Sequence, residues 1–490
     1  MILRQALFTI LGQCTKGFGL RINYIFDLSP IILSQFLVHK QKQQGPDMTD
    51  HNESGAEKAK IPPASPLVNP YASPSARKYA LAVLTLVYTF NFIDRQLLSI
   101  LQESIKVDLS LSDSQLGLLT GFAFAMFYVT AGIPIARFAD RSNRRNIVAV
   151  SVGLWSAMTA VSGLVQNYGQ LLAARVGVGV GEAGGSPPSH SIVSDIFPPE
   201  KRASALAFYS TGVNLGILFG FLFGGWLNEF FGWRIAFMVV GIPGVLLAIL
   251  VRTTVREPIR GLMENRTASD VQVPFKDVVT LLWKRKTFRH MAFACGLNAF
   301  AGYGTVNWIA SFFIRSHEMS TGELGTWLAL STGLFGAIGV LLGGMLGDKL
   351  GKRDKRWYQW IPGIATFLCV PAMLVAFLTD NQYVALMFIF IPGTLQNVYL
   401  GNSIATTHAL VGLRWRSTAS AILFLIINII GLGLGPFGIG YLSDMLAPSM
   451  GVESLRYAML ILLPTVNIWS AIHFYLASRT LREDLKMAPE

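Results

Sequence analysis

Four ionisable residues stand in stretches of the sequence that are otherwise almost entirely apolar: Asp94, Arg95, Arg175 and Glu182. Asp94 and Arg95 are adjacent and interrupt the apolar run Tyr79–Leu101. A charged side chain at the centre of a bilayer costs about 2.5–3.5 kcal/mol on insertion scales, so such a residue is by default a functional candidate. A carboxylate beside a guanidinium in an apolar setting is suited to binding and releasing a proton.

Helical spacing brings Arg175 and Glu182 to one face, because seven residues make close to two turns and a rise of about 10 Å. We predict that Asp94 and Glu182 accept protons. Protonation of either acid would release the arginine beside it, Arg95 or Arg175, and weaken a bridge that holds one conformation. The alternative is that permanent ion pairs lock two helices together. The sequence leaves open which arginine binds which acid.

The elements that must position these residues are membrane-spanning helices. The chain has 490 residues, of which 52% are apolar and 14% charged, whereas soluble domains carry roughly 25% charged residues. About twelve apolar runs are long enough to cross a bilayer, which takes about 20 residues each. The composition therefore predicts an all-α membrane protein with twelve transmembrane helices.

The formal charge of +12 is distributed unevenly between the two sides of these predicted helices. With the segment before Tyr79 placed in the cytoplasm, most lysines and arginines fall in cytoplasmic loops, as the positive-inside rule requires. This pattern favours a multi-pass protein with both termini in the cytoplasm over a nucleic-acid-binding protein. The basic residues left in the outer loops are Lys106, Arg234, Arg315 and Arg456.

The sequence also repeats itself. Residues 111–119 (LSDSQLGLL) match 319–327 (MSTGELGTW), each with a serine followed three residues later by Gln or Glu, which is a capping box. At the same offset, 139–146 (ADRSNRRN) match 347–354 (GDKLGKRD). The repeat predicts two six-helix bundles with a central cleft between them, a geometry suited to alternating access.

The predicted domains follow from this repeat. Residues 1–78 are expected to form a disordered N-terminal segment, and the hypothesis that translation begins near Met48 would place 1–47 outside the native protein. The N-terminal bundle covers 79–252 and the C-terminal bundle 287–480. A cytoplasmic linker, 253–286, joins the bundles, and 481–490 form a cytoplasmic tail.

The turn DRSNRR (140–145) resembles the cytoplasmic signature of the major facilitator superfamily. Together with NFIDR (91–95) and RVGVGVGEA (175–183), it resembles the Spinster subfamily, whose animal members are associated with sphingosine-1-phosphate and lysolipids. The resemblance implies the major facilitator fold and a cytoplasmic gate between the two halves. The gate residues that it implies are Asp140, Arg141, Arg144, Arg145, Asp348, Lys349, Lys352 and Arg353.

Substrate contacts in the second half are expected from polar side chains, because no buried cation stands out there. An anionic head group would then bind near Arg95 and Arg175, with its apolar tail against the second half. The polar candidates are Asn298, Asn307, Gln396, Asn397, Tyr399 and Asn428.

These observations predict a secondary active transporter that moves an amphipathic lipid-like or organic-anion substrate and is coupled to protons. The alternatives are an uncoupled lipid-translocating scaffold or sensor, and a drug exporter or sugar-acid transporter of the same fold. No nucleotide-binding loop or catalytic triad signature points to an enzyme, and no cofactor or metal is expected. We expect a monomer in a bacterial inner membrane, without nucleic acid.

Overall fold

Helices make up the regular secondary structure of the described chain, which comprises residues 69–260, 275–412 and 415–488 of a computed structural model. These residues form no strand. Residues 1–68, and with them most of the predicted disordered segment, lie outside the described residues, as do 261–274 of the predicted linker. The first helices are α3 (Pro74–Leu109), α4 (Asp113–Gly117), π-helix η2 (Leu118–Phe122), α5 (Ala123–Arg141), α6 (Arg144–Ser162), α7 (Tyr168–Ala183), α8 (Ser186–Ile196) and α9 (Pro199–Thr254).

The second series begins inside the predicted linker, with the amphipathic helix α10. Its helices are α10 (Phe275–Lys284), α11 (Lys286–His317), α12 (Thr321–Leu328), π-helix η3 (Ala329–Leu334), α13 (Phe335–Gly351), α14 (Trp357–Leu378), α15 (Gln382–Leu395), α16 (Tyr399–Ala409), α17 (Arg416–Ile427), π-helix η5 (Asn428–Gly433), α18 (Leu434–Met450), 3-10 helix η6 (Gly451–Glu453) and α19 (Ser454–Lys486).

The repeated serines begin their helices as the sequence predicts. Ser112 accepts a hydrogen bond from the Gln115 backbone amide, and the Gln115 side chain accepts one from the Ser112 amide, which completes a capping box. At the equivalent place, the Ser320 hydroxyl accepts from the Glu323 amide. The repeat therefore reflects equivalent local structures.

Seven helical stretches of the described chain are long and apolar enough to cross a membrane. Two of them are far longer than one crossing: Glu200–Thr254 has 55 residues and Thr418–Lys486 has 69, whereas about 20 helical residues span 30 Å. Within the first, Gly232 has φ +80°, a left-handed conformation that glycine tolerates and that reverses the chain. α9 therefore contains two helices on either side of Gly232.

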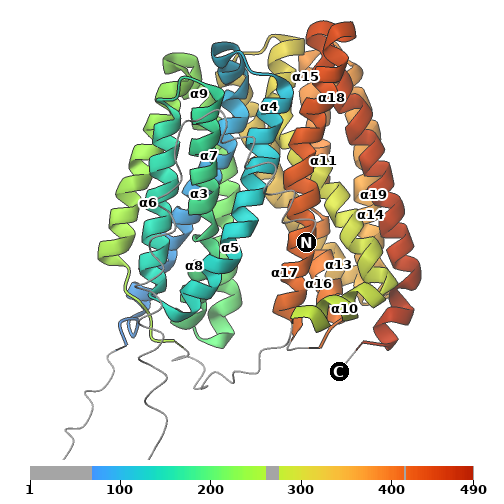
Figure 1. The fold of residues 1–490 in the computed structure, drawn as a ribbon. Coiled ribbons are helices and arrows are strands. Elements are labelled where there is room, and N and C mark those ends of the chain that lie inside the picture. The colour runs from blue at the N-terminus through green and yellow to red at the C-terminus, as the bar shows by residue number, and fades with distance from the viewer. Residues whose placement is uncertain (1–68, 261–274, 413–414, 489–490) are drawn as a thin grey trace, which may run out of the picture. The chain divides into compact units, whose positions relative to one another are not determined.

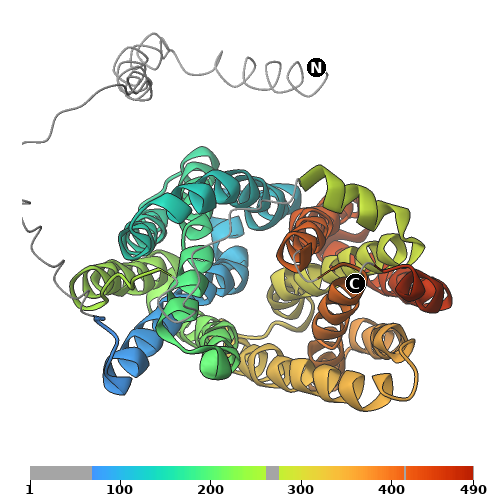
Figure 2. The same ribbon diagram turned by 90° about the horizontal axis from the view of Figure 1, so that it is seen from below.

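The helices lie in two groups (Figures 1 and 2). Helices of residues 74–254 pack together through contacts of α3 and α6 with α9, and those of residues 275–486 through contacts of α11 and α14 with α19. The two groups touch where α3 meets α11, where α4 meets α18, and where α9 meets α12. We call the end that carries Asp113 and Arg315 the Asp113 end, and the opposite end the Arg144 end.

Glycines let the two groups approach closely toward the Asp113 end. A Cβ on Gly117 of α4 would lie 2.5 Å from the Pro436 carbonyl oxygen of α18. A Cβ on Gly121 of η2 would lie 2.9 Å from the Gly433 oxygen of η5. Real Cβ atoms do not come so close to a carbonyl oxygen, so this interface depends on the absence of side chains.

Candidate functional site

The four intramembrane charges form two ion pairs between α3 and α7. Arg95 Nε donates to Glu182 Oε2 at 2.7 Å. Arg175 Nη1 donates to Asp94 Oδ1 at 3.3 Å. The adjacent residues of α3 thus bind residues two turns apart on α7, as the spacing of seven on α7 allows.

Asp94 has a second partner on a third helix. The hydroxyl of Thr159, on α6, lies within hydrogen-bond distance of both Asp94 Oδ2 and the Trp155 carbonyl oxygen, and it can donate its single proton to either of them. Both members of the Asp94–Arg175 pair are 2% exposed. A buried carboxylate is stable when it is paired and hydrogen-bonded, and costs several kcal/mol when it is not.

The Arg95 guanidinium is packed among aromatic rings. Its central carbon lies 5.0 Å from the ring centre of Phe92, 4.9 Å from that of Phe124 and 5.2 Å from that of Tyr128. The negative faces of such rings attract a cation. The rings and Glu182 together hold a charged guanidinium in an apolar surrounding, and the side chain remains 17% exposed.

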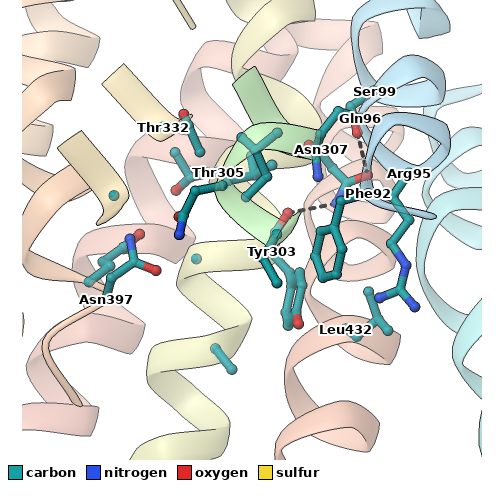
Figure 3. Close-up of a pocket in the computed structure, with 18 of the residues that line it drawn as sticks. Phe92, Arg95, Gln96, Ser99, Tyr303, Thr305, Asn307, Thr332, Asn397 and Leu432 are labelled. Carbon is teal, nitrogen blue, oxygen red and sulfur yellow. Dashed lines mark hydrogen bonds between the residues drawn. The ribbon is translucent and has the colours of Figure 1, made fainter. Parts of the chain in front are cut away.

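A cavity of about 720 Å³ lies in front of these pairs and is lined by both groups of helices. Arg95 and Arg175 belong to its wall, whereas Asp94 and Glu182 lie behind it. Figure 3 shows Arg95 on one side of the cavity and Thr305, Thr332 and Asn397 on the other, with Tyr303 between them. The cavity is therefore cationic on the α3 side and uncharged on the other side.

The polar residues predicted for the second half are placed differently from one another. Asn298 and Asn307 line the cavity, but their side-chain amides form hydrogen bonds within the protein. Asn298 donates to the backbone carbonyl of Gln396 and accepts from Thr366. Asn307 donates to the backbone carbonyl of Tyr303 and accepts from Ser99. Gln396, Asn397 and Tyr399 also line the cavity.

Asn428 is not among the residues that line the cavity, and its predicted contact with substrate stays a prediction. Asn428 begins the π-helix η5, whose extra residue per turn shifts the register of the helix face. A sequence pattern read with a period of 3.6 residues cannot anticipate that shift.

The Asp113 end is closed by a charge network between the two groups. Asp113 accepts from Arg315 at 2.8 Å through both carboxylate oxygens, from Lys106 at 2.6 Å and from Ser443 at 2.7 Å. Arg315 also pairs with Glu103 at 2.8 Å. This network joins α3 and α4 to α11 and α18.

The other basic residues predicted for the outer loops are also paired with acids. Arg234 binds Asp108, and Arg456 binds Glu453 and Asp380. Charge counting alone identified these cations. Asp108 and Asp380 are distant in sequence from their partners, so only the tertiary structure brings these pairs together, whereas Glu453 precedes Arg456 by three residues.

At the Arg144 end, the predicted gate residues Arg144 and Arg145 bind within their own group. Arg144 is 2% exposed and donates to Asp195, to Glu257 at 2.8 Å and to the Pro258 carbonyl. The Arg145 amide donates to Glu257. These contacts fasten the chain after α9 to the start of α6, a role that the sequence did not suggest.

The remaining gate candidates form no ion pair between the groups among the described residues. Arg141, Asp348, Lys349, Lys352 and Arg353 have no side-chain ion pair there, and the Asp140 side chain lies outside the described residues. In the corresponding turn of the second half, Asp354 forms ion pairs with Arg356 and Arg482. Hydrogen bonds from Arg356 and Arg482 lower the pKa of its carboxyl.

Several cavity residues were not predicted from the sequence. Tyr303 and Gly302 occupy the positions equivalent to Arg95 and Asp94, so the repeat pointed to them even though their types did not. Aromatic and hydroxyl side chains on a membrane helix look like ordinary packing residues until their direction is known. The cavity also includes Tyr88, Phe92, Gln96, Ser99, Phe124, Asn214 and Thr305.

Comparisons with known proteins agree with this arrangement. The family profile described as Major Facilitator Superfamily matches residues 84–482. An "MFS-type efflux pump" of Mycolicibacterium smegmatis is 36% identical over 410 residues, covering 83% of this chain and 94% of the relative. The probable galactarate/D-glucarate transporter GudP of Bacillus subtilis is 28% identical over 341 residues, covering 64% and 74%.

A solved structure is also similar over most of the chain. It is a crystal structure of a bacterial homolog of the human lysosomal transporter Spinster, in an inward-facing and unoccupied conformation. It is 33% identical, has a TM-score of 0.75, and the match covers 84% of this chain and 99% of that one.

Proposed function

This chain belongs to the major facilitator superfamily as a Spinster-like transporter, and from that premise we propose that it is a proton-coupled secondary transporter of an amphipathic lipid-like or organic anion. The observation that carries the proposal is the two buried pairs, Arg95–Glu182 and Asp94–Arg175, directly behind the wall of a large cavity. Buried acids next to a solvent-accessible cavity are the residue type that proton-driven transporters need.

The two groups of helices correspond in this proposal to two six-helix bundles, 79–252 and 287–480, that rock about the cavity. The proposed location is a bacterial inner membrane, with both termini in the cytoplasm. The Arg144 end then faces the cytoplasm. The hydrogen bonds between the groups lie toward the Asp113 end, which fits an inward-facing state. The protein acts as a monomer.

Coupling follows from the pairing. When Glu182 takes up a proton, it loses its charge and its attraction for Arg95, and the same applies to Asp94 and Arg175. The freed arginine can then bind an anionic substrate from the cavity. Release of the proton restores the pair and expels the substrate, so a proton gradient biases the two conformations.

The substrate class follows from the cavity. A volume of about 720 Å³ lies within the range of about 300–1,000 Å³ of drug-sized ligand sites, and one side carries cations. A lysophospholipid or a sphingolipid phosphate fits this combination of anionic head and apolar tail. Export of drugs is the second candidate, which the 36% identity to an efflux pump favours.

The test uses purified protein in proteoliposomes with an imposed pH gradient. Lysophospholipids, hydrophilic organic anions and cationic drugs are offered in turn to the wild type and to Asp94→Asn and Glu182→Gln. We expect uphill flux of a lysophospholipid in the wild type and only downhill, pH-independent flux in both variants. Wild-type pH dependence in both variants would defeat the coupling, and flux of drugs alone would replace the substrate class.

A further inference from the structure

The uncharged side of the cavity holds polar side chains without partners. Neither the nitrogen of the Gln396 side-chain amide nor the hydroxyl of Thr305 has a hydrogen-bond partner among the described residues. Gln396 is 8% exposed and Thr305 6%, and both line the cavity. A buried polar group without a partner costs about 1–3 kcal/mol, so such groups are rarely retained in a native protein without a ligand or water to satisfy them.

These groups lie close together. The Gln396 side-chain oxygen lies 3.7 Å from where a Cβ of Gly302 would stand. Gly302 and Thr305 are three residues apart on α11 and therefore neighbours on one face of that helix. Asn397 follows Gln396, and its amide nitrogen bonds the Gly393 carbonyl, which leaves its oxygen without a described partner.

The contrast with the neighbouring amides matters. Asn298 and Asn307 line the same cavity, and in each the side-chain amide nitrogen and oxygen both have a hydrogen-bond partner within the protein. On this side of the cavity, Thr305, Gln396 and Asn397 keep polar atoms available for a molecule that enters it.

We infer that Thr305, Gln396 and Asn397 form a neutral hydrogen-bonding subsite, which binds an uncharged, hydroxyl-bearing segment of an anionic substrate whose charge binds at Arg95. We call it the neutral subsite. The inference rests on the proposed function for the anion and goes beyond it, because it requires hydroxyl groups at a distance from the charge. A simple fatty acid or aromatic acid lacks them. Sugar acids and lysophospholipids with a glycerol head group have them.

The charge of the subsite supports an uncharged partner. No Asp, Glu, Lys or Arg belongs to the cavity wall contributed by α11 to α19 among the described residues. Amide and hydroxyl groups donate and accept at once, which matches the hydroxyl groups of a polyol. A site built to bond hydroxyl groups discriminates strongly against analogues without them, because its polar atoms are then left unpaired.

The experiment measures binding to purified protein with matched probes. The first pair is D-gluconate and hexanoate, six-carbon monoanions that differ in their hydroxyl groups. The second pair is lysophosphatidylglycerol and the lysophosphatidylpropanol that lacks its two head-group hydroxyls. We expect the wild type to bind the hydroxylated member of at least one pair at least tenfold more tightly, and the pair that shows this difference tells a sugar acid from a lipid head group.

The variants are Thr305→Val and Gln396→Leu, with Thr120→Val as the matched control. Thr120 lines the same cavity, but its hydroxyl already donates to the Leu116 carbonyl at 3.0 Å. We expect Thr305→Val and Gln396→Leu each to weaken binding of the hydroxylated probe about 3- to 10-fold, the worth of one neutral hydrogen bond, and to leave the other probe unchanged. Thr120→Val leaves both unchanged.

A second measurement separates binding from folding. Because the subsite groups are unpaired without ligand, Thr305→Val is expected to keep or raise the melting temperature of the ligand-free protein. Equal binding of both members of each pair, or equal losses for both in the variants, would overturn the inference. If Arg95→Ala also leaves probe binding unchanged, the proposed anion site is wrong as well. If only Arg95→Ala weakens probe binding, the anion site is supported and the neutral subsite is wrong.

Discussion

Asp94 and Arg95 are consecutive in α3, yet each pairs with a residue of α7 and not with the other: Asp94 with Arg175 and Arg95 with Glu182. Successive helical positions point about 100° apart, so neighbours cannot share one partner easily. The arrangement gives each acid its own arginine. Two separable pairs allow proton binding at one acid without loss of the other bridge.

The first prediction concerns the buried pair Asp94–Arg175. Arg175→Met leaves the Asp94 carboxylate buried with only Thr159 as a partner, and we expect destabilisation of about 3–5 kcal/mol, the usual cost of breaking a buried pair. Because an unpaired buried carboxylate is relieved by protonation, the loss should shrink as the pH falls. Thermal unfolding of the detergent-solubilised protein at several pH values between about 5 and 8 measures both the loss of stability and its dependence on pH.

The control for this prediction is the double variant Asp94→Asn with Arg175→Met. It removes the charge as well as its partner, so most of the stability should return and the pH dependence should disappear. A double variant as unstable as Arg175→Met alone would show that Arg175 stabilises the fold through contacts other than Asp94.

The second prediction concerns Arg144, which is buried, and Arg141, which is exposed in the same turn. Arg144→Met removes the bonds to Glu257, Asp195 and the Pro258 carbonyl. We expect a clear fall in melting temperature and protease cleavage in the segment after α9. Arg141→Met, the matched change, should unfold at the wild-type temperature; a similar fall in both variants would contradict the role assigned to Arg144.

How much of the fold and the site can be predicted from the sequence depends on how far apart in the chain the interacting residues lie. The helices, their caps at Ser112 and Ser320 and the buried charges followed from local patterns, because hydropathy and capping act over a few residues. The break between α7, which ends at Ala183, and α8, which begins at Ser186, falls at the glycines and prolines of residues 184–188.

The pairing of charges was beyond such patterns. Asp113 binds Arg315, 202 positions away, and no spacing rule selects Arg315 over another arginine. The π-helix that begins at Asn428 shows a second limit, since a π-helix changes the direction of side chains without a signal that a 3.6-residue period detects. Gln396 and Asn307 both carry side-chain amides, and the sequence does not distinguish them. Only the structure shows that the Asn307 amide has partners within the protein, whereas the Gln396 amide nitrogen has none among the described residues.

The third prediction concerns the charge network at the Asp113 end. Asp113→Asn removes the charge that Arg315 and Lys106 share, so the closed state at that end loses stability relative to the open one. We expect greater labelling of a cysteine introduced at Ser99 by a membrane-impermeant maleimide added from outside, in a background without native cysteines. Asp380→Asn, whose partner Arg456 lies at the same end but within one group of helices, should not change the labelling.

The fourth prediction uses glycine contacts to move the same equilibrium without changing charge. A Cβ at Gly117 would lie 2.5 Å from the Pro436 oxygen across the interface between the groups. Gly117→Ala should therefore separate α4 from α18 and increase Ser99→Cys labelling, as Asp113→Asn does. Gly132 lies on α5 in the same stretch of chain, and a Cβ there meets nothing within 4 Å, so Gly132→Ala should label like the parent. If Gly117→Ala unfolds the protein or labels like the parent, the contact is not the one that separates in alternating access. If labelling increases in Gly117→Ala but not in Asp113→Asn, the contact between α4 and α18 controls the opening, and the charge network around Asp113 does not.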